Sequence, residues 1–171
     1  MDKIVNESGK TVLGVISTSP ALRAGPNTRA GAPMRFAVSV LSSVLPTVGV
    51  PRPVPAEDLC HDPEIWKAYK EDPKVHPNMT FCTADSLLTQ GDYMLKNPSK
   101  FNPTNIPVLV SFGSLDTICD PKAGEQFIND ISTTDKTFKL YEGMKHELQN
   151  EPQVKNEVIQ YYLDWMFERA K

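Results

Sequence analysis

The chain has 171 residues, 40% of them hydrophobic, and a formal net charge of −3 at pH 7. This length is enough for one ordinary domain with a buried core, and the weakly acidic balance predicts no electrostatic attraction to nucleic acid. No apolar run approaches the ~20 residues that cross a bilayer, and the amino-terminal segment lacks the apolar region of a secretory signal.

The sequence contains three cysteines, Cys60, Cys82 and Cys119. An odd number at irregular spacing favours free thiols in a reducing compartment over a disulfide framework or a zinc site. We therefore expect a cytoplasmic protein that uses neither a metal nor a cofactor.

The first strand is expected over residues 11–17, where a short apolar and β-branched run follows a polar start. From Gly25 to about Pro103 the composition changes: most of the prolines lie here, and short helical patches alternate with turns. Helices are expected over residues 33–45, 63–70 and 83–95, and the proline-rich residues 46–55 are expected to form an extended linker.

Two of these helices have further features in the sequence. Asp62 and Pro63 stand at the N-cap and the first position of the middle one. Residues 33–45 carry an apolar surface too wide for a simple amphipathic helix, so part of it must be buried or contact lipid. A last amphipathic helix is expected over residues 154–171.

Residues 107–112 form the second predicted strand, because Val108 to Phe112 is short, rich in β-branched residues and without alternation. Such a run is typical of a parallel strand that is covered on both faces. Gly113 ends the run, and Asp116 follows three residues later. Open α/β sheets place their functional residues in the loop beyond the carboxyl end of such a strand.

The third strand is predicted over residues 137–142, and His146 comes directly after it. Residues 121–131, between the second and third strands, have the apolar spacing of a helix. In such a βαβ unit the right-handed crossover places the two loops side by side. Asp116 could therefore hold one ring nitrogen of His146.

Two segments, PVLVSFGSLDTICDPKAGEQF (107–127) and STTDKTFKLYEGMKHELQNEP (132–152), resemble the acid and histidine segments of α/β-hydrolases, and more narrowly of monoacylglycerol lipases. By this resemblance Asp116 is the acid and His146 the general base of a triad in the order Ser, Asp, His. The fold implied is α/β: the C-terminal part of an α/β-hydrolase, with three parallel strands, flanking helices and an inserted, mainly helical lid.

The resemblance also implies that the chain has two parts, a core and a lid. Residues 1–24 and 104–171 would form a partial hydrolase core, and residues 25–103 would form the lid. The implied substrate is a monoacylglycerol or another acyl ester. The hydrophobic lid would contact a lipid droplet or a membrane surface.

The nucleophile is missing from this pattern. None of the eleven serines lies in a G-x-S-x-G frame, and Ser8, the nearest imitation, lacks the preceding glycine. The glycine-containing oxyanion loop of the family is missing as well. We therefore expect a C-terminal fragment or truncated form of a serine ester hydrolase, which hydrolyses monoacylglycerols to fatty acid and glycerol when complete and is inactive alone. Two alternatives are a non-catalytic lipid- or partner-binding remnant and a split enzyme that assembles with a separately encoded N-terminal half.

Other candidate residues have structural interpretations. Asp120 competes with Asp116 as the acid, but its position at the start of a predicted helix favours an N-cap. Cys119 lies on the same loop and is either a reactive thiol beside the acyl pocket or, as we favour, an inert buried one. His61 and His76 lack any such context and are expected on the surface.

Overall fold

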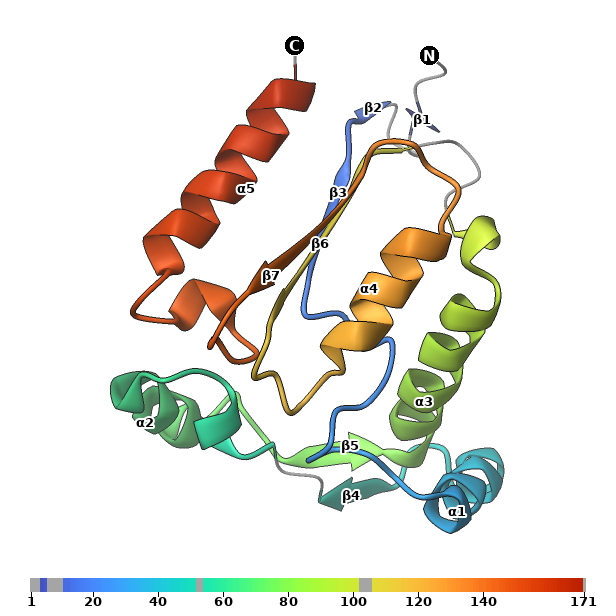
Figure 1. The fold of residues 1–171 in the computed structure, drawn as a ribbon. Helices are drawn as coiled ribbons and strands as arrows, with labels where there is room; N and C mark the ends of the chain where they lie inside the picture. The colour runs from blue at the N-terminus through green and yellow to red at the C-terminus, as the bar shows by residue number, and fades with distance from the viewer. Residues whose placement is uncertain (1–3, 6–10, 52–53, 102–105, 171) are drawn as a thin grey trace.

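The computed structural model describes residues 4–5, 11–51, 54–101 and 106–170. Its centre is a parallel sheet of three strands in the order β3–β6–β7, with helices on both sides (Figure 1). The strands are β3 (Val15–Thr18), β6 (Val108–Gly113) and β7 (Lys136–Tyr141). The predicted sheet of three parallel strands is confirmed, and β6 and β7 each lie one residue from their expected bounds.

The central strand β6 is buried along its whole length because it pairs on both sides and is covered on both faces. Val110 and Phe112 point to one face, where they pack with Phe127 of helix α4 (Pro121–Asp130). Ser111 points to the other face, where its hydroxyl lies 2.5 Å from that of Tyr162. Burial on both faces is the reason that this strand shows no alternation of polar and apolar residues.

Helix α4 lies close to the sheet because Gly124 has no side chain. A Cβ atom at this position would come within 2.3 Å of the Phe112 ring. The helix begins as predicted, with the Asp120 carboxylate accepting a hydrogen bond from the Lys122 amide at 3.0 Å. Asp120 is therefore the N-cap.

Helix α5 (Lys155–Arg169) covers the opposite face of the sheet, as Figure 1 shows. It buries Val158 and Trp165, and the Trp165 ring lies where a Cβ atom on Gly14 would be, at 2.5 Å. Arg169 pairs with Asp135 at 2.6 Å. The predicted final amphipathic helix is thus a sheet-covering helix.

The first predicted strand was wrong in extent. Residues 11–17 do not form one strand: β2 (Thr11–Val12) pairs antiparallel with β1 (Ile4–Val5), and β3 begins only at Val15. The strand begins at Val15 because its partner Val108 is the first residue of β6. The described residues before Val15 therefore have no partner on β6. Among the described residues β3 pairs with β6 alone, so it is an edge of the sheet.

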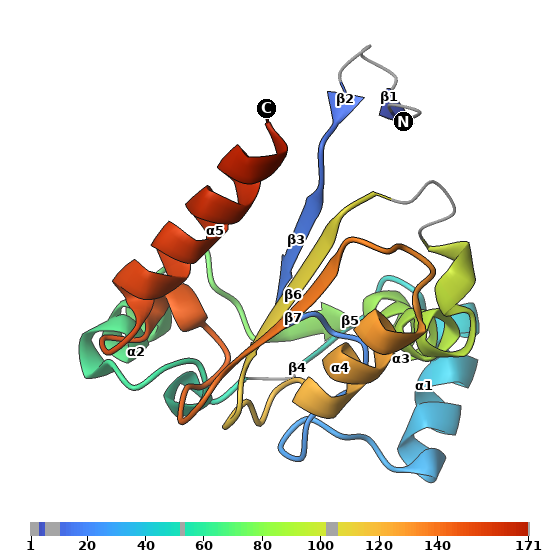
Figure 2. The same ribbon diagram turned by 45° about the horizontal axis from the view of Figure 1, so that its top comes forward.

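The segment between β3 and β6 is mainly helical. Its helices are α1 (Ala32–Val44), η1 (Ala56–Asp58), α2 (Pro63–Glu71), α3 (Phe81–Lys96) and η2 (Pro98–Lys100). The three α-helices confirm the predicted ones, and the Asp62 carboxylate caps α2 by accepting from the Glu64 amide at 3.0 Å. Figure 2 shows α3 beside α4 on one side of the sheet, with α1 beyond them.

The extended linker expected over residues 46–55, of which residues 52–53 lie outside the described part of the chain, contains a strand that was not predicted. Gly49–Pro51 forms strand β4, which pairs antiparallel with β5 (Asn78–Thr80). The backbone is extended there, as the prolines predicted. Each strand has only three residues, too few for an alternating pattern to indicate it.

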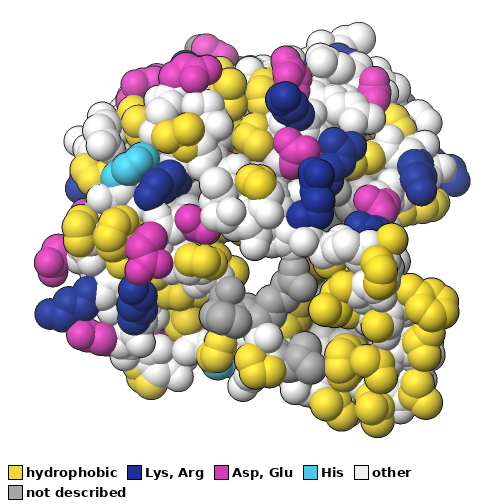
Figure 3. All heavy atoms as spheres, turned by 60° about the horizontal axis from the view of Figure 1, so that its bottom comes forward, with side chains coloured by type: hydrophobic (Ala, Val, Ile, Leu, Met, Phe, Trp, Pro, Cys, Tyr) yellow, Lys and Arg dark blue, Asp and Glu magenta, His cyan; other side chains and the backbone are white. Residues whose placement is uncertain are grey.

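Helix α1 exposes several of its apolar side chains, including Phe36 at 74% and Val44 at 67%. Figure 3 shows these hydrophobic side chains gathered over α1, at the lower right. The helix is held to α3 by an ion pair between Arg35 and Asp92. No helix among the described residues combines the length and apolar character of a membrane span.

The packing at Gly124 gives a test of the core. We expect Gly124→Ala to lower the free energy of unfolding, because the new methyl group overpacks the Phe112 ring at a cost of about 1–3 kcal/mol. This cost exceeds the ~1 kcal/mol by which alanine favours a helix over glycine. Urea denaturation measures the difference, with Glu125→Ala, an exposed change in the same helix, as the control. A Gly124→Ala chain as stable as the control would contradict this packing.

Candidate active site

The loop after β6 buries the carboxylate of Asp116. Its side chain is 0% exposed, and Oδ1 accepts hydrogen bonds from the amides of Ile118 and Cys119, both at 2.9 Å. Amide donors stabilise the ionised form of a buried carboxylate. They also fix its orientation and leave Oδ2 for another partner.

That partner is His146, on the loop after β7. Its Nδ1 atom lies 2.8 Å from Oδ2 of Asp116, so the predicted contact between the two residues is confirmed. An ionised carboxylate can only accept, and Nδ1 therefore carries the shared proton when the ring is neutral. This leaves the lone pair on Nε2, and the side chain is 22% exposed.

The two loops meet because β6 and β7 are parallel neighbours. The amides of Ser114 and Leu115 donate to the carbonyls of Tyr141 and Met144, at 3.0 and 2.9 Å. Gly113 makes this approach possible, since a Cβ atom there would lie 2.2 Å from backbone atoms of the second loop. The end of β6 is therefore in direct backbone contact with the loop that carries His146.

The described serines include none that hydrogen-bonds to the His146 ring. Ser19, just after β3, instead donates from Oγ to the backbone carbonyl of His146 at 2.7 Å. Ser19 is buried and has a positive φ of 42°, which is uncommon for a residue with a side chain. The pair of Asp116 and His146 can bind and release a proton, but in this part of the chain it has no hydroxyl to activate.

The prediction for His61 was wrong, and that for His76 was confirmed. His76 is exposed. His61 is half-buried, and its Nδ1 atom lies 2.9 Å from a carboxylate oxygen of Glu151, which is 0% exposed. Sequence reasoning also missed Glu151. It follows no strand and shows no helical spacing, so only its position five residues after His146 could have drawn attention to it.

Cys119 is buried, as the structural interpretation expected. Burial, and to a smaller extent the charge of Asp116, raise the pKa of its thiol to about 12. A thiol with a raised pKa holds little thiolate at neutral pH, so Cys119 is an inert residue of the wall. Burial and the raised pKa both favour this interpretation over that of a reactive cysteine.

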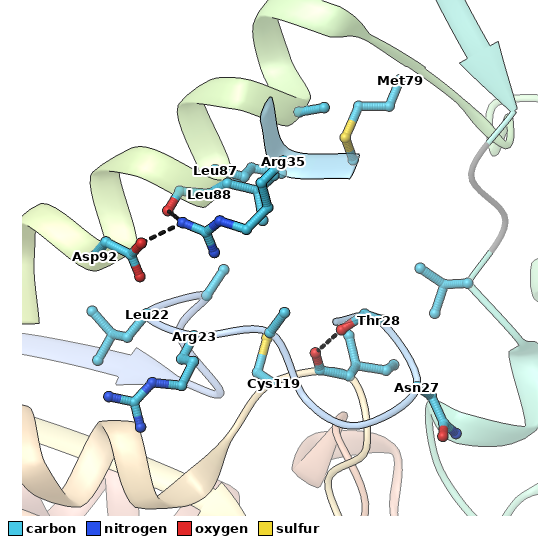
Figure 4. Close-up of a pocket in the computed structure, with 15 residues that line it drawn as sticks. Leu22, Arg23, Asn27, Thr28, Arg35, Met79, Leu87, Leu88, Asp92 and Cys119 are labelled. Carbon is cyan, nitrogen blue, oxygen red and sulfur yellow. Dashed lines mark hydrogen bonds and ion pairs between the residues drawn. The ribbon is translucent and has the colours of Figure 1, made fainter. Parts of the chain in front are cut away.

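A cavity of about 340 Å³ opens between this loop and helices α1 and α3. Figure 4 shows its mainly apolar wall, with Leu22, Leu87, Leu88 and Cys119 around it and the pair of Arg35 and Asp92 at one side. Ile118 and Cys119, whose amides hold Asp116, both line it. Its volume lies within the range of small-molecule sites, ~300–1,000 Å³.

The described ranges contain no group of three or more His, Cys, Asp and Glu side chains that could hold a metal ion. The apolar cavity beside a histidine and a buried carboxylate instead suits an uncharged organic ligand.

Comparison with known proteins gives concordant results. The family described as "Serine aminopeptidase, S33" matches residues 3–153. The chain is 28% identical to the monoglyceride lipase of Saccharomyces cerevisiae over 80% of its own length and 45% of the relative's. It is 33% identical to the monoacylglycerol lipase of Mycolicibacterium smegmatis over 72% of its length and 43% of the relative's. The chain therefore spans less than half of these two relatives.

A solved structure agrees with them. A soluble variant of the S. cerevisiae monoglyceride lipase, in complex with a substrate analogue, superposes with a TM-score of 0.80 at 26% identity. The match covers 91% of this chain and 56% of that one. The partial α/β-hydrolase fold expected from the sequence is thereby confirmed.

Burial of the cysteines gives a second test. We expect one thiol, Cys82, to react rapidly with N-ethylmaleimide in the native chain at pH 7.5, because Cys60 and Cys119 are buried. Burial also raises the pKa of Cys60. Mass spectrometry counts the adducts, and all three cysteines should react in urea. Cys82→Ser should abolish native labelling, and rapid labelling of Cys119 would contradict its place in the wall.

Proposed function

Because the chain belongs to the serine aminopeptidase S33 family of α/β-hydrolases, we propose that Asp116 and His146 are the acid and the general base of a serine ester hydrolase. The observation that carries this proposal is the 2.8 Å contact between Nδ1 of His146 and Oδ2 of Asp116. With the proton on Nδ1, this contact would leave Nε2 free to accept a proton, as a triad requires.

The reaction would be acyl transfer to water. Nε2 of His146 takes the proton of a serine hydroxyl as the oxygen attacks the ester carbonyl, and then gives it to the leaving alcohol. Asp116 holds the ring in the tautomer that leaves Nε2 free, and it stabilises the imidazolium that forms. In the second half of the cycle a water molecule takes the place of the serine and releases the acid.

The proposed substrate is a monoacylglycerol, cleaved to fatty acid and glycerol. Its support is of two kinds: the relatives are monoglyceride lipases, and the cavity is mainly apolar where it adjoins the Asp116 loop. The proposed lid is residues 25–103, whose helix α3 contributes Ala84, Leu87, Leu88 and Asp92 to the cavity wall, while α1 contributes Arg35.

We propose that the serine and the oxyanion donors belong to an N-terminal half that these 171 residues do not include. The absence of a G-x-S-x-G frame from the sequence supports this, as does the short span relative to the relatives. In subtilisin, loss of the serine costs on the order of 10⁶ in kcat, as much as loss of the whole triad. The chain alone would therefore be inactive.

The alternative, a non-catalytic lipid- or partner-binding remnant, takes its support from the missing nucleophile. It gives no reason for the buried Asp116 to be oriented by two amides and joined to His146. A split enzyme with a separately encoded N-terminal half would contain the same contact between Asp116 and His146, so this contact does not distinguish it from one longer enzyme. An in-frame G-x-S-x-G upstream of the codon for Met1 would decide for one longer enzyme.

The activity test uses the chain alone and the chain fused to an N-terminal half with an oxyanion loop and G-x-S-x-G. The chain alone should neither hydrolyse monoacylglycerols above a His146→Ala background nor react with a fluorophosphonate, which needs an activated serine. The fusion should do both. In the fusion, Asp116→Asn should lower kcat by about 10⁴, because it stabilises the wrong imidazole tautomer.

Asp130→Asn, an exposed change on α4, is the matched control and should leave turnover unchanged. Fluorophosphonate labelling of the isolated chain at one of its own serines would overturn the proposal. So would a fusion in which Asp116→Asn and Asp130→Asn behave alike.

The exposed apolar face of α1 supports a second element of the proposal, contact of the lid with a membrane or lipid-droplet surface from the cytoplasm. Three free cysteines are in keeping with a reducing compartment. Phe36 and Val44 point away from the core and would enter the lipid without any rearrangement of it.

Vesicle binding tests this contact. The double change Phe36→Ser and Val44→Ser should weaken partition into phosphatidylcholine vesicles tenfold or more, because each side chain gains about 1.5–3 kcal/mol when fully buried. Co-sedimentation measures the partition. The matched control is Phe167→Ser with Ile159→Ser, two exposed apolar residues on α5. Equal losses in the two double variants would show that α1 is not the contact.

A further inference from the structure

We propose that Glu151 is a positioning residue for His146, an inference that rests on the proposed function of His146 as a general base. Glu151 does not touch the imidazole. It holds the backbone next to it, and through His61 it joins that backbone to the segment that precedes α2.

The carboxylate of Glu151 is buried, and both of its oxygens accept hydrogen bonds. Oε1 accepts a hydrogen bond from the Lys145 amide at 2.6 Å, and Oε2 accepts one from the His61 amide at 3.1 Å. The Nδ1 atom of His61 lies within 3.0 Å of both oxygens. A carboxylate at 0% exposure is costly without such donors, so these contacts explain why a charge stays in the interior.

The contacts matter because of where they lie in the chain. Lys145 immediately precedes His146, and its amide is held by Glu151. On the other side of the histidine, the Glu147 amide donates to the carbonyl of Leu59 at 2.7 Å. The His146 carbonyl accepts from Ser19 at 2.7 Å. Three hydrogen bonds therefore hold the backbone at His146, and two of them come from segments distant in the chain.

One of these anchors, Leu59, belongs to residues 57–66, which also contact the side chain of Lys145. Besides Leu59, this segment supplies the Glu57 carbonyl, which accepts from Nζ of Lys145 at 2.6 Å. It also supplies the Trp66 ring, whose centroid lies 5.5 Å from the same Nζ atom. Figure 1 shows the η1–α2 region packed beneath the turn that leads into α5.

Glu151 is the point at which these contacts converge. Its backbone connects η3 (Leu148–Asn150) to α5, since its carbonyl accepts from the Lys155 amide at 2.9 Å. Its side chain turns back to Lys145 and across to His61. Loss of the carboxylate would release the Lys145 amide and remove one of the three hydrogen bonds that hold the backbone at His146, so that the ring could move relative to Asp116. Displacements of about 1 Å at a catalytic group are enough to slow an enzyme ~10²-fold.

The test reads the ring of His146 in the 171-residue chain, without reliance on catalysis. The chain has three histidines, so long-range ¹H–¹⁵N spectra of ¹⁵N-histidine-labelled protein contain few signals. In the native chain His146 should show a proton fixed on Nδ1, as its contact with Asp116 requires. The exposed His76 serves as the internal reference.

In Glu151→Ala we expect loss of the fixed Nδ1 proton of His146 and a pattern like that of His76. Glu151→Gln should restore it, because the amide oxygen can still accept from the Lys145 amide next to His146, although the NH2 group cannot replace the oxygen that accepts from the His61 amide. Glu125→Ala, at an exposed glutamate of α4, should match the native chain. Recovery in Glu151→Gln separates positioning from the loss of a buried charge.

Circular dichroism and urea midpoints establish which variants are folded. If Glu151→Ala unfolds, Glu151→Asp replaces it, since a carboxylate one methylene shorter cannot reach both Lys145 and His61. A folded Ala or Asp variant that keeps the native His146 signal would overturn the inference, as would a Gln variant that loses it completely. An inactive fusion protein would instead count against the proposed function, so the two failures are distinguishable.

Discussion

The parallel pairing of β6 with β7 is the constraint on which the rest of the site depends. It brings the ends of two strands to the same edge of the sheet, and the turn after each strand then has only a few residues in which to present a side chain. Gly113 lets the two turns approach to backbone contact. The carboxylate and the imidazole meet because the strands that carry them are neighbours.

The part of the fold that could be predicted is the part in which local and tertiary preferences agree. β6 is uniformly apolar because both of its faces are covered, and α4 has a proline and an N-capping aspartate where a helix must begin. The pairing of Asp116 with His146 followed from topology together with family resemblance. Prediction failed where tertiary contacts alone determine the strand. The start of β3 depends on the start of its partner β6, and β4 forms because it pairs with β5.

The same reasoning explains the residues of the site that were missed. A buried glutamate has no signature in a sequence, because its burial is made possible by donors that fold in from elsewhere. For Glu151 these are the Lys145 amide, a few residues away, and the groups of His61, distant in the chain. His61 was placed on the surface because an isolated histidine gives no sign of the carboxylate that it will meet. Long-range polar contacts of this kind become visible only with the fold.

The way in which Asp116 is held has a consequence for how such a site can diversify. The amides of Ile118 and Cys119 orient the acid, while the side chains of the same two residues face the cavity. Under the proposed function, ligand selectivity and the alignment of His146 are therefore coupled through one short turn. A substitution that reshapes this wall and shifts its backbone also tilts the carboxylate. Changes in ligand preference are accordingly easier to accommodate on the opposite wall, at Leu87 and Leu88 of α3, where the cavity can widen while the acid stays in place.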